Sequence, residues 1–453
     1  MQHLWFEEAR LADGWARHVR VRITDGRIAA IERETPREPE DAAHGVAVPG
    51  LANLHSHAFQ RGMAGLAERR GPANDDFWTW REVMYRFLDR LTPDDVEAIT
   101  AQAFAEMLTA GFTWVGEFHY LHNDIDGRAY ADPGELSDRI AAAARTTGIG
   151  LTLLPVFYAH GGFGGLAPGP GQRRFITNPD SFARLVERAR SAASGLLGAR
   201  VGIAPHSLRA VTPEELQAIL PLAAGAPVHI HAAEQLGEVA ECVAWSGVRP
   251  VQWLLDHAPV DETWCLIHAT HLEGSEPARL ASSGAVAGLC PVTEANLGDG
   301  IFPAREYIGR GGRFGVGTDS NILIDAASEL RALEYSQRLE TRSRNLLAPR
   351  EGASVGAALF DGALAGGAQA MGVHEAGLQV GACADIVALD PAHPSLLERR
   401  GDAILDAWIF AGGREAVEAV WRAGDQVVAE GRHRQAQPIA ARYRKTLKRL
   451  LTD

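Results

Sequence analysis

The fold is decided by the stretch Val48-Pro49-Gly50-Leu51-Ala52-Asn53-Leu54-His55-Ser56-His57, an apolar run that ends in two histidines. Residues i and i+2 of a strand point to the same side, so His55 and His57 present both imidazoles at one end of a strand. Two imidazoles in this arrangement can hold one metal ion. The pair is a weak signal alone, and its meaning depends on whether further ligands follow at the ends of later strands.

Seven further strand-like runs follow, and helix-compatible stretches separate them. They cover residues 112–118, 150–157, 200–204, 227–231, 264–268, 285–289 and 314–318. With residues 51–55 they make eight strands. One of the helices begins at Thr92-Pro93-Asp94-Asp95, which supplies an N-cap, a first-position proline and acidic residues in the first turn. Eight strand–helix units predict an α/β fold of the (β/α)8 TIM-barrel type. The stretch from Gly161 to Gly171 follows the third strand and is a candidate mobile lid.

Both ends of the chain carry strand-like pieces outside this repeat, separated by the turns Asp25-Gly26 and Gly424-Asp425. These pieces are residues 4–6, 19–23, 28–31, 384–389, 419–423 and 426–429. The simplest topology pairs both termini in one small β-sandwich domain. We expect this domain to cover residues 1–48 and 375–435, the barrel to cover 49–374, and a carboxy-terminal helix to cover 436–453.

Charge and composition exclude several classes of protein. The net charge of −13 argues against a nucleic-acid partner, and the absence of an apolar run of about 18 residues argues against a membrane span. The first residues lack the basic and apolar regions of a signal peptide, which favours the cytoplasm. The four cysteines form no CxxC pair, so neither a disulfide framework nor a zinc knuckle is expected. Cys265 and Cys290 lie in apolar runs and are predicted to be buried thiols.

Polar side chains recur where the predicted strands end. They are His55, His57, Glu117, His119, Tyr120, His206, Arg209, His231, Glu234, His268 and Asp319. Active sites of TIM barrels lie at this end of the strands. Three histidines and a carboxylate suit Zn²⁺, and the metal lowers the pKa of a bound water to about 7, which makes hydroxide available at neutral pH. A nearby carboxylate is then needed to move protons.

As a set, this pattern resembles the amidohydrolase superfamily, in which HxH closes the first strand, histidines close the fifth and sixth, and aspartate closes the eighth. The resemblance implies one Zn²⁺ per chain, with Fe²⁺ or Mn²⁺ as possible substitutes, held by His55, His57, His231 and Asp319. A carbamylated lysine cannot bridge two metals, because the only lysines, Lys445 and Lys448, lie outside the barrel. The HxxE pattern that ends in Glu234 is typical of mononuclear deaminases of the superfamily, and a bridging role for Glu117 stays an alternative.

Within the superfamily, four segments resemble the formimidoylglutamate deiminase family of histidine degradation. They are residues 54–65, 116–120, 205–210 and 291–300. The resemblance implies hydrolysis of N-formimino-L-glutamate, a small dicarboxylate, to N-formyl-L-glutamate and ammonia. It also implies a homodimer. Formiminoaspartate, which is shorter by one methylene, is not distinguished by these motifs.

The same resemblance assigns roles to strand-end residues. Asp319 takes the water's proton, Glu234 exchanges protons with the departing nitrogen or the attacking water, and His268 orients the water. In an alternative reading, His268 is a second metal ligand. The substrate-binding residues implied are Gln60, Arg81, Tyr120, His206 and Arg209. The two arginines can each grip a carboxylate as a bidentate fork, whereas a surface salt bridge is the alternative for Arg81. His229 is predicted to lie in the core or behind the ligands.

Two other functions stay open at this point. One is a mononuclear deaminase of the same superfamily that acts on guanine or another aromatic base. Such an enzyme needs a pocket for a planar neutral ring and has no evident use for two arginines. The other is a non-catalytic scaffold of the same fold, which is expected to lack metal ligands that this chain retains.

Overall fold

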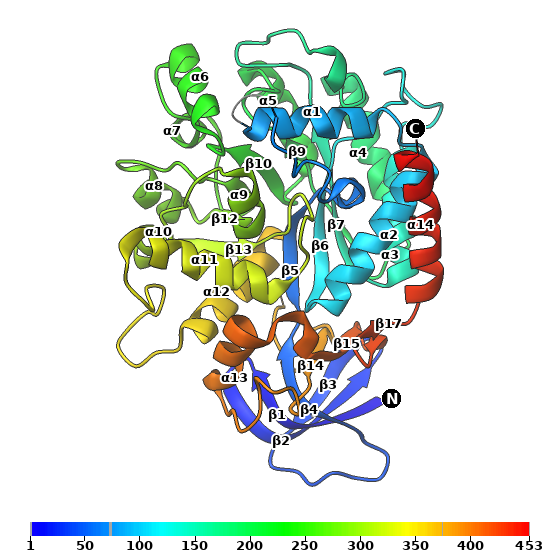
Figure 1. Cartoon of the computed structure of the whole chain (residues 1–453), viewed down its shortest axis with the longest axis vertical. Helices are drawn as coiled ribbons and strands as arrows, with labels where there is room; N and C mark the ends of the chain where they lie inside the picture. Colours follow the sequence, from blue (N-terminus) through cyan, green and yellow to red (C-terminus); the bar gives the residue numbers. More distant parts are fainter. Residues whose placement is uncertain (1, 72–74, 374, 453) are drawn as a thin grey trace.

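The computed structural model describes residues 2–71, 75–373 and 375–452, and its central feature is a ring of parallel strands (Figure 1). The strands of the ring are β5 (Leu51–Ser56), β6 (Phe112–His119), β7 (Gly150–Phe157), β8 (Arg200–Val201), β9 (Ala204–Pro205), β10 (Val228–Ala232), β11 (Trp264–His268), β12 (Val286–Leu289) and β13 (Arg313–Val316). All eight predicted strands are present. The fourth consists of two short pieces, β8 and β9, both paired with β7.

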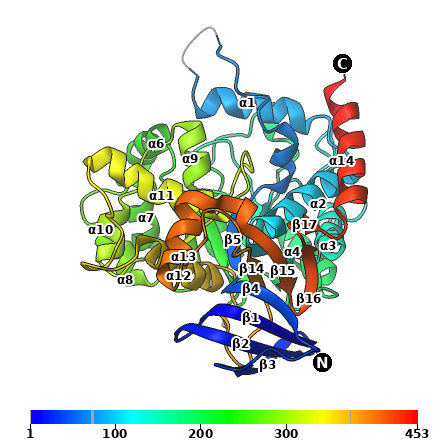
Figure 2. The ribbon, with the colours of Figure 1, turned by 60° about the horizontal axis from the view of Figure 1, so that its bottom comes forward.

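The helices lie outside the ring. They are α1 (Phe77–Leu88), α2 (Pro93–Thr109), α3 (Glu135–Thr147), α4 (Pro179–Ala193), α5 (Pro213–Ile219), α6 (Leu236–Ser246), α7 (Pro250–His257), α8 (Glu276–Ser283), α9 (Pro291–Leu297), α10 (Ala304–Gly309), α11 (Ala326–Thr341), α12 (Val355–Ala370), α13 (Asp402–Ala407) and α14 (Ala436–Leu451). The start predicted for α2 is confirmed, because Thr92 accepts a hydrogen bond from Asp95 N. Helix α1 crosses the end of the barrel opposite the β domain (Figures 1 and 2).

The barrel consists of two parallel sheets, β5-β6-β7-β8 and β10-β11-β12-β13, that meet at two seams. At one seam, Ile203 pairs with Val228. At the other, Asp319 N donates to His55 O and His57 N donates to Asp319 O, both at 2.9 Å. A Cβ at Gly317 would lie 2.7 Å from His55 N, so only glycine allows this approach. Closure at both seams confirms the TIM barrel.

Strands from both termini form one sheet, in the order β17-β16-β15-β14-β4-β1-β2-β3. The strands are β1 (Gln2–Leu11), β2 (Gly14–Thr24), β3 (Arg27–Glu32), β4 (Ala42–Pro49), β14 (Ile386–Leu389), β15 (Val417–Arg422), β16 (Asp425–Ala429) and β17 (Arg432–His433). The sheet encloses its own apolar core, in which Leu4, Phe6 and Trp421 are buried. The small β domain built from both termini is therefore confirmed, and it lies below the barrel in Figure 2.

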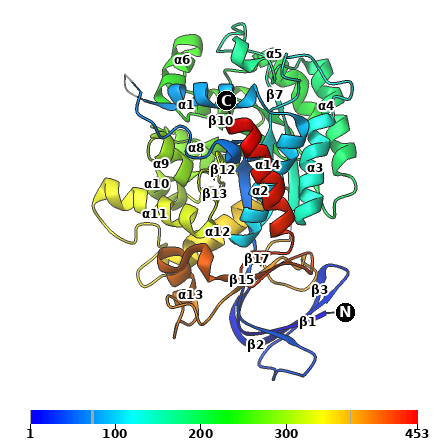
Figure 3. The same ribbon diagram turned by 45° about the vertical axis from the view of Figure 1, so that its right-hand side comes forward.

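The carboxy-terminal helix α14 runs along α2 on the outside of the barrel (Figure 3). Residues 374 and 453, at two of the predicted domain boundaries, lie outside the described residues. Cys265 and Cys290 are fully buried, as predicted. In the described ranges, no helix is long and apolar enough to cross a membrane.

The candidate lid between β7 and α4 has internal hydrogen bonds. Gly161 N donates to Leu166 O at 2.8 Å. Gly169 N donates to Oε1 of Gln172, the residue that follows the segment, at 2.7 Å. Gln172 Nε2 donates in turn to the hydroxyl of Tyr158 at 2.6 Å, and Tyr158 lines the cavity described below. The segment therefore contacts the wall of that cavity, and its closure as a lid stays a prediction.

Candidate metal centre and active site

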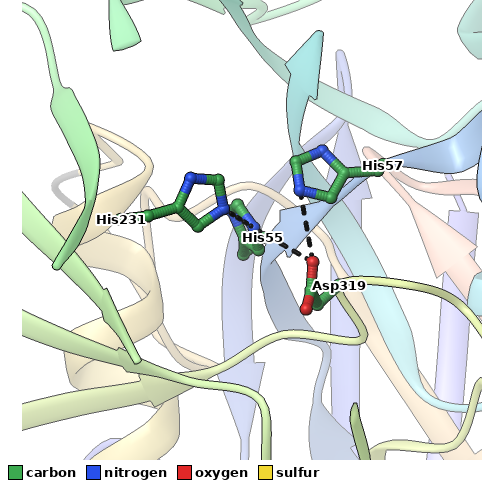
Figure 4. Close-up of side chains that lie close together, drawn as sticks. All are labelled: His55, His57, His231 and Asp319. Atoms are coloured by element: carbon green, nitrogen blue, oxygen red, sulfur yellow. Dashed lines mark hydrogen bonds and ion pairs between the residues drawn. The ribbon is translucent and has the colours of Figure 1, made fainter. Parts of the chain in front are cut away.

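Four of the predicted ligands converge at the carboxyl ends of the strands (Figure 4). The ligand atoms of His55, His57, His231 and Asp319 all lie within 4.8 Å of one another, and all four residues are buried. Asp319 Oδ1 lies 3.3 Å from His55 Nε2 and 3.2 Å from His57 Nε2. His231 Nε2 lies 3.1 Å from His55 Nε2. This group is a candidate metal site, made of three imidazoles and one carboxylate.

Backbone carbonyls orient two of these imidazoles. His57 Nδ1 donates to Phe118 O and His231 Nδ1 donates to His206 O, both at 2.9 Å. A proton on Nδ1 leaves the Nε2 lone pair directed at the centre, which is the arrangement that a metal ligand needs. Burial lowers the pKa of His55 and of His231 well below the ordinary value, and neighbouring histidines lower both further. The imidazoles are therefore neutral, as metal ligation requires.

Glu234 and His268 lie beside this group. His268 Nε2 is 3.8 Å from Glu234 Oε1 and 3.9 Å from Asp319 Oδ2, and its Nδ1 is 3.2 Å from Glu294 Oε1. Burial raises the pKa of Glu234 to about 7. Burial lowers the pKa of His268, but the carboxylates of Glu234, Glu294 and Asp319 outweigh it and raise the pKa to about 10. The cluster therefore combines groups able to hold and to give a proton.

The backbone around these residues is strained. His268 and Asp319 have φ values of 66° and 43°, in the left-handed region that residues other than glycine rarely adopt. Ala233, directly before Glu234, has a φ of 51°. Such conformations cost about 1–3 kcal/mol each and concentrate at functional sites. The strained residues therefore lie at the ends of β10, β11 and β13, where the metal donors and the proton-transfer groups also lie.

A cavity opens onto the metal donors. Its lining residues are His57, Gln60, Phe77, Trp80, Arg81, Met84, Tyr85, Tyr120, Tyr158, Phe175, His206, Arg209, His231, Glu234, His268, Leu297 and Asp319. The structure thus brings together in one wall all the residues that the resemblance implied for substrate binding. His55 lies behind the wall, fully buried.

The two arginines of this wall have no acceptor among the residues that the structure describes. Within the described residues, neither Arg81 nor Arg209 forms a hydrogen bond or an ion pair, and the Nε atom of each is buried. The alternative that Arg81 forms a surface salt bridge is therefore wrong. Arg81 also lies on α1, not in the loop that the sequence suggested, because a capping box at Asp76 and Thr79 begins a helix there. Arg209 is 8% exposed, so its charge faces the cavity and little else.

Gln60 offers an unused acceptor to the same cavity. Its Nε2 donates to the Tyr120 hydroxyl at 2.8 Å, and that hydroxyl lies 3.2 Å from Met84 Sδ. Its Oε1 is buried without a partner in the described residues. The Tyr120 contact thus fixes the amide so that its oxygen is left for a ligand.

Two other predicted residues lie away from this centre. Glu117 Oε1 accepts a hydrogen bond from Ala58 N at 2.8 Å, and the carboxylate is not among the four converging donors. His229 Nε2 donates to Ala370 O at 2.8 Å, so it occupies the core as predicted. His268 belongs, with Cys290 and Asp319, to a second group of three possible ligands.

Sequence reasoning missed several members of the site. Glu294, which accepts hydrogen bonds from Cys290 N, contacts His268 from the start of α9. Glu294 lies within residues 291–300, one of the four segments that resemble the formimidoylglutamate deiminases, so the sequence contained a signal for it. The aromatic wall was missed altogether. Its members Phe77, Trp80, Tyr85, Tyr158 and Phe175 come from loops and from α1, whose aromatic cluster at residues 77–80 was the only hint.

Comparisons with known proteins agree with this geometry. The family model "Amidohydrolase family" matches residues 46–427, and "Formimidoylglutamate deiminase HutF, N-terminal domain" matches residues 1–45. The formimidoylglutamate deiminase of Pseudomonas aeruginosa is 51% identical, with 100% of each chain covered. The 8-oxoguanine deaminase of the same organism is 30% identical over 70% of this chain and 71% of that one.

Solved structures give the same result. An amidohydrolase from Brucella melitensis has a TM-score of 0.97 and 56% identity, with 100% of both chains covered. A zinc-bound adenosine deaminase from Xanthomonas campestris shares the fold, with a TM-score of 0.81 and 22% identity over 100% of this chain and 99% of that one. The chain therefore belongs to the amidohydrolase family, and its amino-terminal domain and full-length similarity group it with the formimidoylglutamate deiminases.

Proposed function

We propose that this protein hydrolyses N-formimino-L-glutamate to N-formyl-L-glutamate and ammonia. The observation that carries the proposal is the pair Arg81 and Arg209, two cations that lack a protein acceptor in the described residues and face a cavity ending at the metal donors. A dianionic ligand supplies the acceptors that both guanidinium groups need. The full-length relative, itself a formimidoylglutamate deiminase, supports the same reaction.

The metal is proposed to be a single Zn²⁺, held by His55, His57, His231 and Asp319. Fe²⁺ or Mn²⁺ could substitute. The donor set fits, because neutral imidazole and carboxylate are ligands that zinc prefers and the Nε2 atoms of His57 and His231 are already directed inward. When bound, the metal lowers the pKa of a coordinated water and makes hydroxide available near neutral pH.

The reaction adds water across the formimino carbon and breaks its bond to the terminal nitrogen. Asp319 accepts a proton from the attacking water. Glu234, which lies across from Asp319 beside His268, delivers this proton to the imino nitrogen and then carries the proton of the tetrahedral hydroxyl to the same nitrogen, which departs as ammonia. His268 donates from Nε2 toward the developing tetrahedral centre, while Glu294 holds its Nδ1. The side chains thus leave one formyl group and one ammonia per water consumed.

The lining residues other than the metal donors orient the substrate. Arg81 and Arg209 bind the two carboxylates, which directs the formimino end toward the metal donors. Gln60 Oε1 accepts a hydrogen bond from a formimino N–H, since no protein donor occupies that atom in the described residues. Tyr120 and His206 complete the wall between the arginines and the metal group.

The experiment is a product assay on the zinc-loaded protein. N-formimino-L-glutamate, guanine and cytosine are compared for ammonia release, and the organic product is identified by mass spectrometry. We expect ammonia and N-formylglutamate from the first substrate alone. Release of ammonia only from guanine or cytosine would overturn the proposal, and so would formamide and glutamate as products. No hydrolysis at all, in a preparation that binds no metal, would support a non-catalytic role.

We also propose a division into three parts: a β domain over 1–48 and 375–435, a barrel over 49–374 and a helix over 436–453. The separate apolar core of the β domain supports this division. So does the boundary at residue 45 between the two matching family models.

A further inference from the structure

The indole ring of Trp78 contacts both arginines of the cavity. The guanidinium carbon of Arg81 lies 4.4 Å from the ring centroid, and that of Arg209 lies 5.4 Å from it. Cations within about 6 Å of a Trp centroid are attracted by the ring. Trp78 is not one of the lining residues, so it contacts the arginines without occupying the binding space.

This ring is the main contact that can fix the two guanidinium groups. Within the described ranges, neither group has a hydrogen bond or an ion pair, and Tyr85 adds one weaker contact to Arg81 at 5.5 Å. Because the guanidinium carbons of Arg81 and Arg209 both lie within 5.4 Å of the Trp78 centroid, the two charges also lie close to each other. Like charges that close repel each other. An aromatic ring in contact with both groups offsets part of that repulsion and limits where each can lie.

Trp78 is itself held between two elements. Asp76 caps α1 by accepting a hydrogen bond from Trp78 N at 2.9 Å, and the ring of Phe77 packs edge-on at 5.1 Å. A Cβ built on Gly237 in α6 would lie 3.8 Å from the indole. Since Gly237 follows Glu234 by three residues, the indole spans from α1 to the segment that carries the proton-transfer carboxylate. Its position is therefore tied to the reacting end of the cavity.

We propose that Trp78 is a positioning residue that sets the spacing of Arg81 and Arg209 and thereby the length of the dicarboxylate that the cavity accepts. The inference rests on the proposed function and deepens it. N-formiminoglutamate and N-formiminoaspartate differ by one methylene, and a pocket discriminates such a difference by about 10- to 200-fold. Fixed guanidinium groups are a means to reach that discrimination, because a shorter chain cannot satisfy both and also reach the metal donors.

The kinetic test compares Trp78→Leu, which keeps an apolar side chain without a π face, with Trp78→Phe, which keeps the face. For Trp78→Leu we expect KM for formiminoglutamate to rise at least tenfold while kcat stays within about threefold, since no group at the metal is altered. Trp78→Phe should recover most of the KM. Trp15→Ala removes another half-buried tryptophan, one that bonds to Asp402 in the β domain, and should change neither constant.

The second readout is selectivity. Trp78→Leu should lower the ratio of kcat/KM for formiminoglutamate over formiminoaspartate at least fivefold, and calorimetry should show the same loss in the ratio of affinities for N-formyl-L-glutamate and N-formyl-L-aspartate. An unchanged KM and unchanged ratios would overturn the inference, as would a fall in kcat alone. Because the calorimetry needs no turnover, it tests Trp78 even if wild-type protein releases no ammonia from formiminoglutamate, a result that sinks only the proposed reaction.

Discussion

Asn53 and Thr318 are joined by two hydrogen bonds across the seam where the barrel closes. Asn53 Nδ2 donates to Thr318 Oγ1 at 2.6 Å, and Thr318 N donates to Asn53 Oδ1 at 3.0 Å. The Thr318 hydroxyl then donates to Asn321 Oδ1 at 2.6 Å, and Asn321 Nδ2 donates to Ser56 Oγ at 3.1 Å. All four residues are buried. This network links the strand that carries two histidine ligands to the segment that carries the aspartate ligand.

Removal of one hydroxyl should therefore weaken metal binding. Thr318→Val keeps the side-chain shape but leaves buried polar groups of Asn53 and Asn321 unsatisfied, at about 1–3 kcal/mol each. Because outer contacts orient the ligands, we expect the Kd for Zn²⁺ to rise about 10- to 100-fold in a chelator competition assay. Thr152→Val is the control: its hydroxyl on β7 donates to Met371 O at 2.9 Å, away from the metal group. Equal losses of zinc affinity in both variants would contradict the prediction.

Glu234 should be needed for turnover but not for metal binding. Glu234→Gln keeps the size of the side chain and removes the carboxylate that exchanges protons, which is worth about 10²–10⁴ in rate. We expect kcat to fall by that factor while the zinc content stays at that of the wild type. Glu214→Gln, an exposed substitution on α5, should leave both unchanged. Normal turnover by Glu234→Gln would remove it from the mechanism.

Arg209 should act on substrate binding. Hydrogen bonds to charged groups contribute about 1.5–3 kcal/mol, so Arg209→Ala should raise KM about 10- to 150-fold with a smaller change in kcat. Steady-state kinetics with formiminoglutamate measures both. The matched control is Arg190→Ala on α4, where an exposed arginine donates to Leu222 O. If KM for Arg209→Ala equals that of the control, Arg209 does not bind the substrate.

The metal ligands could be predicted from sequence because two rules suffice for them. Period-two geometry places His55 and His57 on one side of a strand, and the carboxyl ends of barrel strands share one face. His231 and Asp319 then follow from their places at the ends of β10 and just after β13, and the structure brings all four together. Neither rule needs knowledge of long-range packing.

The cavity wall could not be predicted in the same way. Arg81 lies on a helix inserted before α2 and outside the eight strand–helix units, and although its capping box and buried residues at helical spacing are legible in the sequence, they do not say where the helix lies over the barrel. Contacts such as Trp78 to Arg209 join segments that are far apart in the chain, and periodicity says nothing about such pairs. The geometry of α1 over the barrel decides them.

Acid should destabilise the fold through two buried histidines. Burial lowers the pKa of His122 and of His229 to about 4, well below the value of about 6.5 in an unfolded chain. Between these two pH values the unfolded chain binds a proton that the folded protein does not, so stability present above pH 6.5 is lost as the pH falls toward 4. Each histidine accounts for up to about 3 kcal/mol of that loss.

The measurement is urea unfolding of the metal-free protein at pH 7 and pH 4.5, which separates this effect from release of the metal. His122→Gln keeps a donor for Val156 O, which His122 Nε2 contacts at 2.8 Å, but it cannot take up a proton. We expect the variant to lose about 2–3 kcal/mol less than the wild type on acidification, because its unfolded state gains no proton at this position. Equal losses in both proteins would mean that His122 titrates alike in the folded and unfolded states, contrary to its burial.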